Sequence, residues 1–167
     1  MGGENFRKSV VNLIIPYARQ NNKIILLVGD MGFGATDNFK REFPDRIFNT
    51  GMMEQGTVGI AAGMAMTGLV PVVYSIVNFL AFRSLEQIRN DVVLQKLNVK
   101  FIATGVEDYF KFLGPSHCCG QGDNALDKII MNLIGMKVFD PYEKSDADFK
   151  TLVGKWITSP DAGFMRV

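Results

Sequence analysis

The sequence predicts an α/β protein whose mainly parallel β-sheet is flanked by helices on both faces. The first reason is its pattern, because short apolar runs that suit buried strands alternate with segments whose apolar residues recur at helical spacing. The second is its composition, because 47% of the 167 residues are hydrophobic and only 21% are charged. This composition supplies a sizeable core, and the length fits one domain over residues 1–167. Strands that alternate with helices in this way imply right-handed crossovers.

The elements are expected in a regular order along the chain. Residues 10–17 carry apolar side chains at helical spacing, and residues 23–28 form a largely apolar run that is typical of a buried strand. In folds of this kind the chemistry lies in the loops that follow the carboxyl ends of the strands. Further helices are expected at 61–66, 85–97, 123–133 and 146–157, further strands at 70–74, 99–103, 136–139 and 164–167, and the relevant loops at 29–34, 50–54, 75–79 and 104–122.

Charge and hydropathy argue against several classes of function. Eighteen basic and seventeen acidic side chains leave a net charge of +1, which gives no electrostatic case for nucleic acid or an anionic membrane surface. The longest apolar stretch, residues 69–82, is interrupted by Pro71 and by polar side chains, and it is shorter than the about 20 residues that span a membrane. The first residues do not resemble a signal peptide. The adjacent Cys118 and Cys119 cannot build a disulfide framework, so we expect a reducing, cytoplasmic location.

Residues 48–68 are the most informative part of the sequence. They read Phe-Asn-Thr-Gly-Met-Met-Glu-Gln-Gly-Thr-Val-Gly-Ile-Ala-Ala-Gly-Met-Ala-Met-Thr-Gly. This order places the Glu54 carboxylate at the first turn of a helix, behind Met52 and Met53, which would shield it from water. The helix is rich in glycine and alanine, so another backbone can approach it closely. Taken alone, Glu54 is better explained as a first-turn acid that complements the helix dipole.

Four segments in the same order resemble one family. Residues 48–68 resemble the pyrimidine-binding domain of transketolase-type thiamine-diphosphate enzymes, whose motif runs Asn-x-Gly-Ile-x-Glu-Gln before a small-residue helix. Residues 86–100 resemble the family's next helix and strand, and residues 114–117 (Gly-Pro-Ser-His) resemble its Gly-Pro-Thr-His loop. Residues 135–141 are similar to the strand that follows. The resemblance covers residues 10–167 and implies the thiamine-diphosphate-binding fold.

The resemblance implies roles for the residues around Glu54. In the family a glutamate hydrogen-bonds N1′ of the cofactor's aminopyrimidine and promotes loss of the proton from thiazolium C2, and Glu54 occupies that position. Such chemistry needs a carboxyl group that shares a proton, a state that apolar surroundings favour. Met53 is expected to line the same cofactor site. An aromatic ring stacks on the pyrimidine in the family, and the matching loop offers Phe79 first and Phe82 second, although both rings also suit the core.

Two further residues are implicated by position. His117, the only histidine, lies in the Gly-Pro-Ser-His loop, which implies contact with a substrate hydroxyl or carbonyl, or a proton shuttle near neutral pH. Asp30 follows the first strand, where the family also has an aspartate, and is expected either to contact the cofactor or a partner or to form a turn. Cys118 and Cys119 follow His117 directly. Three consecutive side chains diverge too far for a chelating site, so we expect no metal ligands.

The diphosphate half of the family's site has no counterpart in the sequence. The metal–diphosphate motif of the family, Gly-Asp-Gly followed at a distance by Asn, does not occur, and residues 29–34 match it poorly. The diphosphate needs a divalent cation and oxygen ligands that this chain does not supply. We therefore expect a larger partner subunit to hold Mg²⁺ or Ca²⁺ and the diphosphate, in an α2β2 heterotetramer.

These features predict the pyrimidine-binding subunit of a split transketolase-like enzyme. Such a transferase moves a two-carbon ketol unit from a ketose donor to an aldehyde acceptor, in carbohydrate metabolism. Two alternatives are the β-subunit of a 2-oxo-acid dehydrogenase complex and a non-catalytic scaffold that kept the fold. Leu113 stands where the family usually has an aspartate that recognises a sugar hydroxyl, and the segment before it, residues 109–112, is aromatic. Simple sugar phosphates are therefore expected to be poor substrates.

Overall fold

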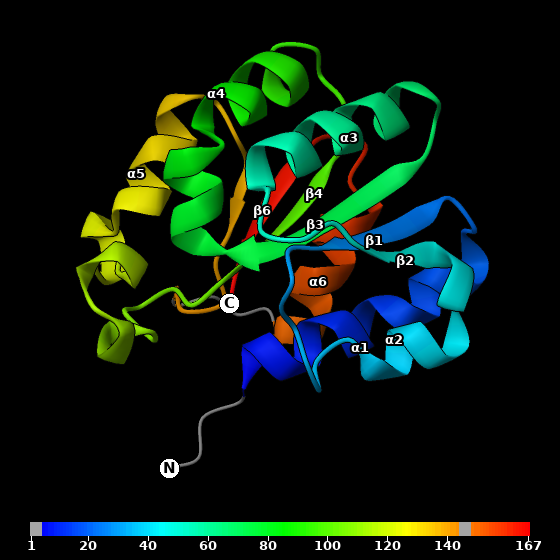
Figure 1. Ribbon diagram of the computed structural model, residues 1–167, viewed down its shortest axis with the longest axis horizontal. Helices are drawn as coiled ribbons and strands as arrows, with labels where there is room; N and C mark the ends of the chain where they lie inside the picture. Colours follow the sequence, from blue (N-terminus) through cyan, green and yellow to red (C-terminus); the bar gives the residue numbers. More distant parts are fainter. Residues whose placement is uncertain (1–4, 144–147) are drawn as a thin grey trace.

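A computed structural model describes residues 5–143 and 148–167 of the chain. At its centre is a six-stranded sheet in which all neighbouring strands run parallel, in the order β2-β1-β3-β4-β6-β5 (Figure 1). This confirms the α/β fold with a mainly parallel sheet that the sequence predicts. The strands are β1 (Ile24–Val28), β2 (Ile47–Asn49), β3 (Val70–Ile76), β4 (Lys100–Thr104), β5 (Val138–Phe139) and β6 (Gly163–Arg166).

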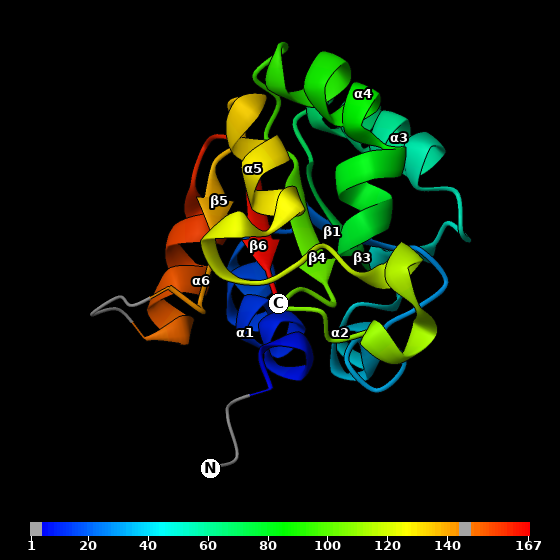
Figure 2. The same cartoon turned by 90° about the vertical axis from the view of Figure 1, so that its left-hand side faces the viewer.

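Helices cover both faces of the sheet. Helices α3, α4 and α5 lie on one face, and α1, α2 and α6 lie on the other (Figures 1 and 2). The connections β2–β3, β3–β4 and β4–β5 run toward the β5 edge of the sheet and cross the first face. The connections β1–β2 and β5–β6 run in the opposite direction and cross the second face, as right-handed crossovers require. The helices are α1 (Phe6–Gln20), α2 (Asp37–Glu42), α3 (Glu54–Met66), α4 (Leu85–Gln87), α5 (Leu126–Leu133) and α6 (Phe149–Thr158), with the π-helical turns η2 (Phe79–Arg83) and η3 (Ile88–Val93) on either side of α4.

The sheet separates two hydrophobic cores. All residues of β1 and β4 are buried, because helices cover both faces, and such strands need continuous apolar sequence rather than alternation. On one face Phe39 of α2 and Trp156 of α6 pack against the sheet together with α1. On the other face Leu80 of η2 and Met131 of α5 pack against it together with α3. The central strands are therefore held rigidly, and the loops at their carboxyl ends start from fixed positions.

The structure corrects several of the expected elements. The helix expected at 85–97 is instead the short helix α4 followed by the π-helical turn η3, and a second π-helical turn, η2, precedes them. The π-helix is rare and occurs frequently at functional sites. The helix expected at 123–133 begins at Leu126. The start of the helix expected at 146–157 lies outside the described residues, and α6 is described from Phe149. Helix α2 and strand β2 were not predicted, because each is too short for the spacing of its apolar residues to reveal a helix or a strand.

The strand order reverses twice, and each reversal creates a switch point at the carboxyl edge of the sheet. Strand β1 leads to β2 on one side, and β3 then lies on the other side of β1, so the first switch point lies between β1 and β3. The second lies between β4 and β6, because β5 is placed outside β6. Ligands of open α/β sheets bind at such points, outside the carboxyl ends of the strands.

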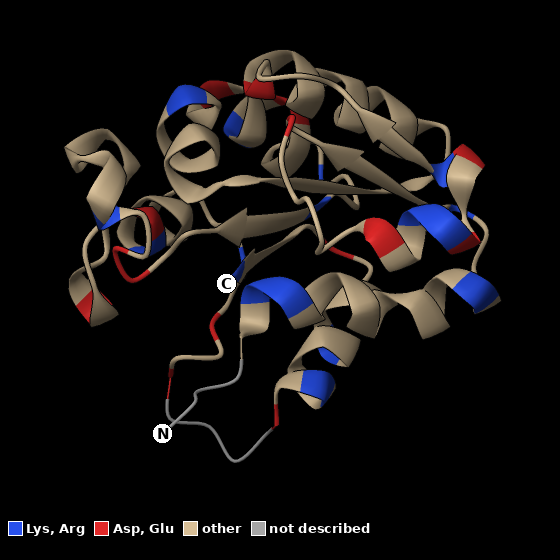
Figure 3. Ribbon diagram, turned by 60° about the horizontal axis from the view of Figure 1, so that its bottom comes forward, with Lys and Arg blue, Asp and Glu red and all other residues tan. Residues whose placement is uncertain are grey.

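Charged side chains are spread over the molecule rather than sorted by sign. In the view of Figure 3, acidic and basic residues are scattered over the helices and loops, and the strands are mostly uncharged. This distribution agrees with the net charge of +1. Over residues 5–143 and 148–167, no helix combines the length and the apolar character that crossing a membrane requires.

Candidate active site

The loop between β2 and α3 is fixed to the end of β1. The Thr50 N–H donates to the Val28 carbonyl at 2.9 Å, and the Gly51 N–H donates to Asn49 Oδ1 at 2.9 Å. Gly51 has a φ of +73°, which a residue with a side chain rarely adopts. These bonds place the start of α3 over the first switch point. Glu54 is the first residue of that helix, as predicted.

Glu54 is a buried carboxylate, and each of its oxygens has a partner. Its side chain is 1% exposed. Oε1 accepts a hydrogen bond from Ser75 Oγ at 3.1 Å, and Oε2 accepts one from Arg83 Nη1 at 2.6 Å. Ser75 reaches Glu54 because β3 continues to Ile76, beyond the predicted end of this strand, and pairs there with β4. The carboxylate therefore lies where β3, α3 and η2 meet.

The two methionines before Glu54 do not form the apolar wall that the sequence suggested. Met52 is 72% exposed and Met53 is 51% exposed. Both precede the first helical residue, on the part of the loop that faces solvent, and this is why the expectation was wrong. Glu54 packs instead against Ser75 and close to Gly29, where an added Cβ would lie 3.6 Å from Glu54 Oε1. Met53 lies next to the carboxylate in sequence, at the rim of the site.

Three predicted site residues are joined through Arg83. Its guanidinium carbon lies 4.1 Å from the centre of the Phe79 ring, within cation–π range. The Phe79 ring in turn meets the His117 ring edge to face, with the ring centres 5.4 Å apart. Glu54, Arg83, Phe79 and His117 thus form a continuous line of contacts, here called the Glu54–His117 row. The Arg83 side chain is 43% exposed, so the row opens to solvent at that residue.

Asp30 and Phe82 lie beside this row rather than in it. Asp30 has a φ of +52° and forms a reciprocal pair with Asn49: its N–H donates to Asn49 Oδ1, and its Oδ1 accepts from Asn49 Nδ2, both at 3.0 Å. This pair ties the loop after β1 to the end of β2, which favours the turn interpretation of Asp30. Phe82 is 43% exposed, and its ring does not share the Arg83 contact that Phe79 makes.

The backbone next to His117 is anchored to η2 through Asn78. Asn78 Nδ2 donates to the Cys118 carbonyl at 2.9 Å, and the Cys119 thiol donates to Asn78 Oδ1 at 3.1 Å. Burial raises the pKa of Cys119 to about 12, so this thiol is not a nucleophile at neutral pH. On the other side, His117 Nδ1 lies 2.9 Å from Ser116 Oγ. The ring is therefore held through Nδ1.

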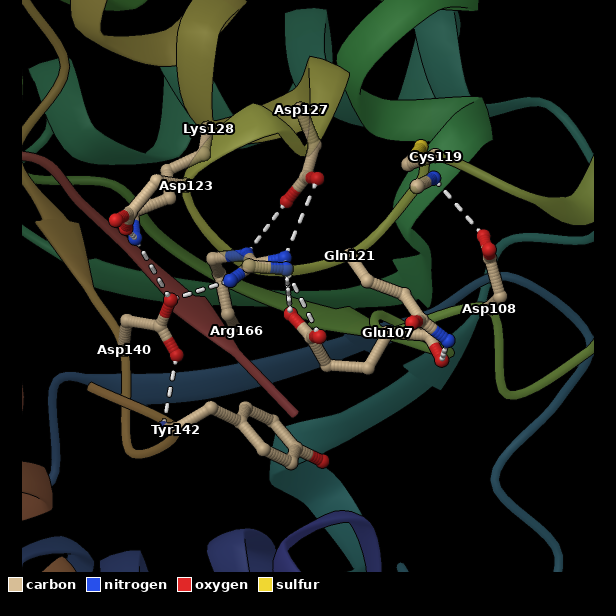
Figure 4. Close-up of polar contacts among 12 residues, drawn as sticks. Glu107, Asp108, Cys119, Gln121, Asp123, Asp127, Lys128, Asp140, Tyr142 and Arg166 are labelled. Carbon is tan, nitrogen blue, oxygen red and sulfur yellow. Dashed lines mark hydrogen bonds and ion pairs between the residues drawn. The ribbon is translucent and has the colours of Figure 1, made fainter. Parts of the chain in front are cut away.

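The second switch point is filled by a closed group of charges, here called the Arg166 cluster (Figure 4). Arg166, at the end of β6, is 0% exposed. Its guanidinium donates to Asp127 at 2.7 Å, to Glu107 at 3.1 Å and to Asp140. Burial alone would lower the pKa of Arg166, but Asp127 and Asp140 outweigh it and raise that pKa. Lys128 completes the cluster, 3.5 Å from Asp140.

The Arg166 cluster also braces the loop that carries His117. Glu107 Oε2 accepts from the Gly122 N–H at 3.0 Å, and Asp108 Oδ1 accepts from the Gly120 N–H at 2.9 Å. Both Glu107 and Asp108 have a φ of +55°, a conformation that costs a non-glycine residue about 1–3 kcal/mol. Such strain persists where surrounding contacts over-determine the backbone, and here those contacts fasten the two ends of one loop together.

The segment before His117 presents apolar side chains to solvent. Arg7 of α1 holds it, with the guanidinium carbon 4.2 Å from the centre of the Tyr109 ring and 4.8 Å from that of Phe110. Phe112 is 77% exposed and Leu113 is 50% exposed. The rim of the site next to His117 is therefore apolar where the resembling family has a carboxylate.

The Glu54–His117 row fits the pyrimidine half of thiamine diphosphate. Glu54 offers a buried carboxylate oxygen, Oε2, which accepts a hydrogen bond from the Arg83 guanidinium. Phe79 offers a ring face, and the carbon of the same guanidinium lies 4.1 Å from the centre of that ring. A flat heterocycle with N–H donors on its edge matches both surfaces. In the part of the chain that the structure describes, no group of three or more His, Cys, Asp or Glu side chains is arranged to hold a metal ion.

Sequence reasoning missed Ser75 and Arg83, the two partners of Glu54. Ser75 was placed only in a loop, because the predicted strand ended one residue before it. Arg83 follows Phe79 by four residues, which is about one helical turn. A cation one turn after a candidate stacking ring was therefore a signal that the sequence offered, since it predicts that both side chains lie on one face.

The chain was compared with known families and proteins. The family described as transketolase, pyrimidine binding domain, matches residues 4–162. A protein of Methanocaldococcus jannaschii described as a transketolase C-terminal section is 34% identical over 140 residues, which is 83% of this chain and 44% of that protein. The 6-deoxy-6-sulfo-D-fructose transketolase subunit SqwH of Clostridium sp. (strain MSTE9) is 27% identical over 140 residues, with coverage of 83% and 42%.

A solved structure is similar over almost the whole chain. It is a split-gene transketolase in an inactive β4 tetramer, with a TM-score of 0.81 and 30% identity, and the similarity covers 98% of this chain and 50% of that one. The chain thus spans about half the length of these relatives. The residues that match the family, 4–162, include the Glu54–His117 row and strands β1 to β5, and β6 begins just after them. This chain belongs to the transketolase pyrimidine-binding domain family.

Proposed function

We propose that this chain is the pyrimidine-binding subunit of a split, thiamine-diphosphate-dependent transketolase-like enzyme. It would form one domain and would transfer a two-carbon ketol unit from a ketose donor to an aldehyde acceptor. The observation that carries the proposal is the Glu54–His117 row, in which a buried carboxylate, an aromatic ring and a histidine line the carboxyl edge of the sheet. Family membership, and relatives of about twice the length, support it.

The residues of the row have separate tasks in this proposal. Thiamine diphosphate, when bound, supplies the nucleophilic carbon that breaks and makes the carbon–carbon bond. Glu54 would hydrogen-bond N1′ of the aminopyrimidine, and its carboxyl would take and return the proton there. The Ser75 hydroxyl on Oε1 fixes the plane of the carboxyl group and leaves Oε2 for the ring. Phe79 would support the face of the pyrimidine.

His117 would act on the substrate side of the row. Its Nδ1 lies 2.9 Å from Ser116 Oγ, and a hydrogen bond to one ring nitrogen decides the protonation of the other. Nε2 would then contact a hydroxyl or carbonyl oxygen of the sugar. The brace formed by Glu107 and Asp108 keeps this loop in place, so the distance from His117 to Phe79 is set by the fold.

A partner subunit would complete the site. The sequence lacks the family's Gly-Asp-Gly…Asn motif, and the chain spans half of the split-gene relative. We therefore assign the diphosphate and its Mg²⁺ or Ca²⁺ to a larger subunit. Each active site would then lie between two different chains, and two-fold symmetry favours an α2β2 assembly.

Titration calorimetry tests the proposed assembly. This chain alone should bind thiamine diphosphate weakly or not at all, because it would hold only the pyrimidine half. The complex with the larger subunit should bind the cofactor, and binding should depend on Mg²⁺. Sedimentation of the same samples should give the mass of an α2β2 tetramer. Tight, metal-dependent binding by this chain alone would contradict the proposal.

A further inference from the structure

We propose that Arg83 is an internal stand-in for the aminopyrimidine. In the free chain it occupies the cofactor's place on Glu54 and Phe79, and it must leave that place before the cofactor can bind. The inference rests on the proposed function, because it names the residue with which the pyrimidine competes. It concerns only the pyrimidine half of the site, which this chain supplies.

Arg83 makes the two contacts that the pyrimidine would make. Its Nη1 donates to Glu54 Oε2 at 2.6 Å, and its guanidinium carbon lies 4.1 Å from the centre of the Phe79 ring. A guanidinium is flat, carries N–H donors along its edge and stacks on aromatic faces. An aminopyrimidine is also flat, carries N–H donors on its edge and stacks. Two such groups cannot occupy one carboxylate oxygen and one ring face together.

The geometry allows Arg83 to leave without loss of the surrounding structure. Glu54 is 1% exposed, whereas the Arg83 side chain is 43% exposed, so the pair is closed at the carboxylate and open at the arginine. Arg83 is the last residue of η2, and Leu80 and Ala81 anchor that turn in the core. The guanidinium can therefore rotate into solvent while η2 stays packed.

The stand-in has a function in the free chain. A buried carboxylate without a partner is strongly destabilising, and Glu54 is buried before any cofactor arrives. Arg83 satisfies Glu54 Oε2 during that time and covers the exposed face of Phe79. The same contacts raise the concentration of cofactor that is needed for binding, because the pyrimidine must displace them. Arg83 thus stabilises the free subunit and lowers its affinity for the cofactor.

NMR of the full chain with ¹⁵N-labelled arginine tests the displacement directly. The probe is 4-amino-5-hydroxymethyl-2-methylpyrimidine, the free pyrimidine half of the cofactor, and the Arg83 signals are assigned by their loss in Arg83→Met. As the probe binds, the Arg83 Nε–H and Nη–H signals should move to the values of a solvent-exposed arginine, and the Arg166 signals should not move. Binding of the probe with the Arg83 signals unchanged would overturn the proposal.

Affinity provides the second test. Arg83→Met should bind the probe about tenfold more tightly than wild type, equivalent to ~1.4 kcal/mol. Arg89→Met is the matched control, because Arg89 is exposed and its Nη1 donates to Asn90 at 2.7 Å, away from the row; its affinity should equal that of wild type. Equal or weaker binding by Arg83→Met, or no binding by any form, overturns the stand-in.

The design separates this inference from the proposed function. If Arg83→Met does not fold, Arg83→Lys serves to assign the Arg83 signals, and the displacement of Arg83 in the wild-type chain decides. If the complex with the larger subunit binds thiamine diphosphate with Mg²⁺ but Arg83→Met gains no affinity for the probe, the stand-in is wrong and the proposed function stands. If the complex binds no cofactor, the proposed function is wrong, and the proposal that Arg83 is a stand-in is then wrong as well.

Discussion

The two switch points of the sheet both hold an arginine against buried carboxylates, yet they differ in how they are closed. Between β4 and β6, Arg166 is 0% exposed and contacts Asp127, Asp140 and Glu107. Between β1 and β3, Glu54 is 1% exposed but its partner Arg83 is 43% exposed. In the first group the arginine and two of its carboxylates are sealed from solvent and only Glu107, 24% exposed, reaches the edge, whereas in the second only the carboxylate is sealed.

This difference separates a structural ion pair from one that can be exchanged. Breaking a sealed pair leaves a charge with neither water nor a partner, so the Arg166 cluster resists change and can brace a loop. Breaking the half-open pair returns Arg83 to water, and only Glu54 needs a new partner. A group that binds Glu54 can provide it. At one edge of the same sheet, the Arg166 cluster therefore keeps a loop rigid, whereas the Glu54–Arg83 pair can exchange its arginine for another group.

The largest effect is expected when the sealed cluster is broken. Arg166→Met should lower the free energy of unfolding by about 3–5 kcal/mol, because it leaves Asp127 and Asp140 buried without their cation. Arg83→Met should cost less than Arg166→Met, because it leaves one buried carboxylate rather than two, and Glu54 keeps its bond from Ser75. Urea unfolding of both variants measures the two values. Equal losses would show that exposure does not distinguish the two pairs.

Another buried cation, Lys100, sharpens the comparison, since its partners are carbonyls in place of carboxylates. Lys100 is 0% exposed, and its Nζ donates to the carbonyls of Ser159, at 2.8 Å, and Asp161. Burial lowers the pKa of Lys100 from its ordinary 10.5 to about 8. Between these pH values the unfolded chain binds more protons than the folded chain, so the free energy of unfolding should rise with pH, by at most about 3 kcal/mol.

Lys100→Met isolates this contribution, because every other group titrates in both proteins. The difference in unfolding free energy between wild type and Lys100→Met, followed from pH 7 to 10.5 by urea unfolding, should grow in favour of wild type as the pH rises. A difference that stays constant across this range would show that carbonyls hold the lysine charge as well as carboxylates do.

The apolar rim next to His117 offers a smaller, functional test. Leu113 is 50% exposed where the family usually has an aspartate. Leu113→Asp should improve kcat/KM for simple sugar phosphates by ten- to hundredfold in the assembled enzyme, since a satisfied hydroxyl is worth about 1–3 kcal/mol. Leu133→Asp is the control, because Leu133 is 83% exposed on α5, in another part of the chain. Ordinary transketolase rates in the wild-type enzyme would show that Leu113 is a neutral replacement.

The smallest effect concerns the two aromatic rings. Phe79 contacts both Arg83 and His117, whereas Phe82 lies beside the row. Phe79→Leu should weaken cofactor binding in the complex by about 0.5–1.5 kcal/mol through lost stacking, and Phe82→Leu should change it little. Calorimetry on both variants checks the order. A larger loss for Phe82→Leu would transfer the stacking role to that ring.

The sheet, the Glu54 helix and the His117 loop could be predicted because their signals are local. The run Ile24–Val28 is continuously apolar, and Glu54 lies directly before a small-residue helix. The Arg166 cluster could not be predicted, because Arg166 meets carboxylates 26, 39 and 59 residues away in the sequence. Only the second switch point brings them together.

The surroundings of Glu54 were predicted less well than its position. Sequence order suggested that Met52 and Met53 would shield it, but shielding depends on where the loop turns, and the turn leaves both methionines exposed. The partner Arg83 lies in the π-helical turn η2, between the loop predicted at 75–79 and the helix predicted at 85–97, so helical spacing was not applied to it. The identity of a site residue was thus more predictable than its partners.

Hydrogen–deuterium exchange at C2 of thiamine diphosphate bound to the assembled complex tests the role of Glu54 most directly. Glu54→Gln keeps the size of the side chain and its position at the start of α3, but it cannot share a carboxyl proton with N1′. The account predicts exchange at least about a hundredfold slower than in wild type, with little change in thermal stability. Exchange at the wild-type rate in Glu54→Gln would contradict it.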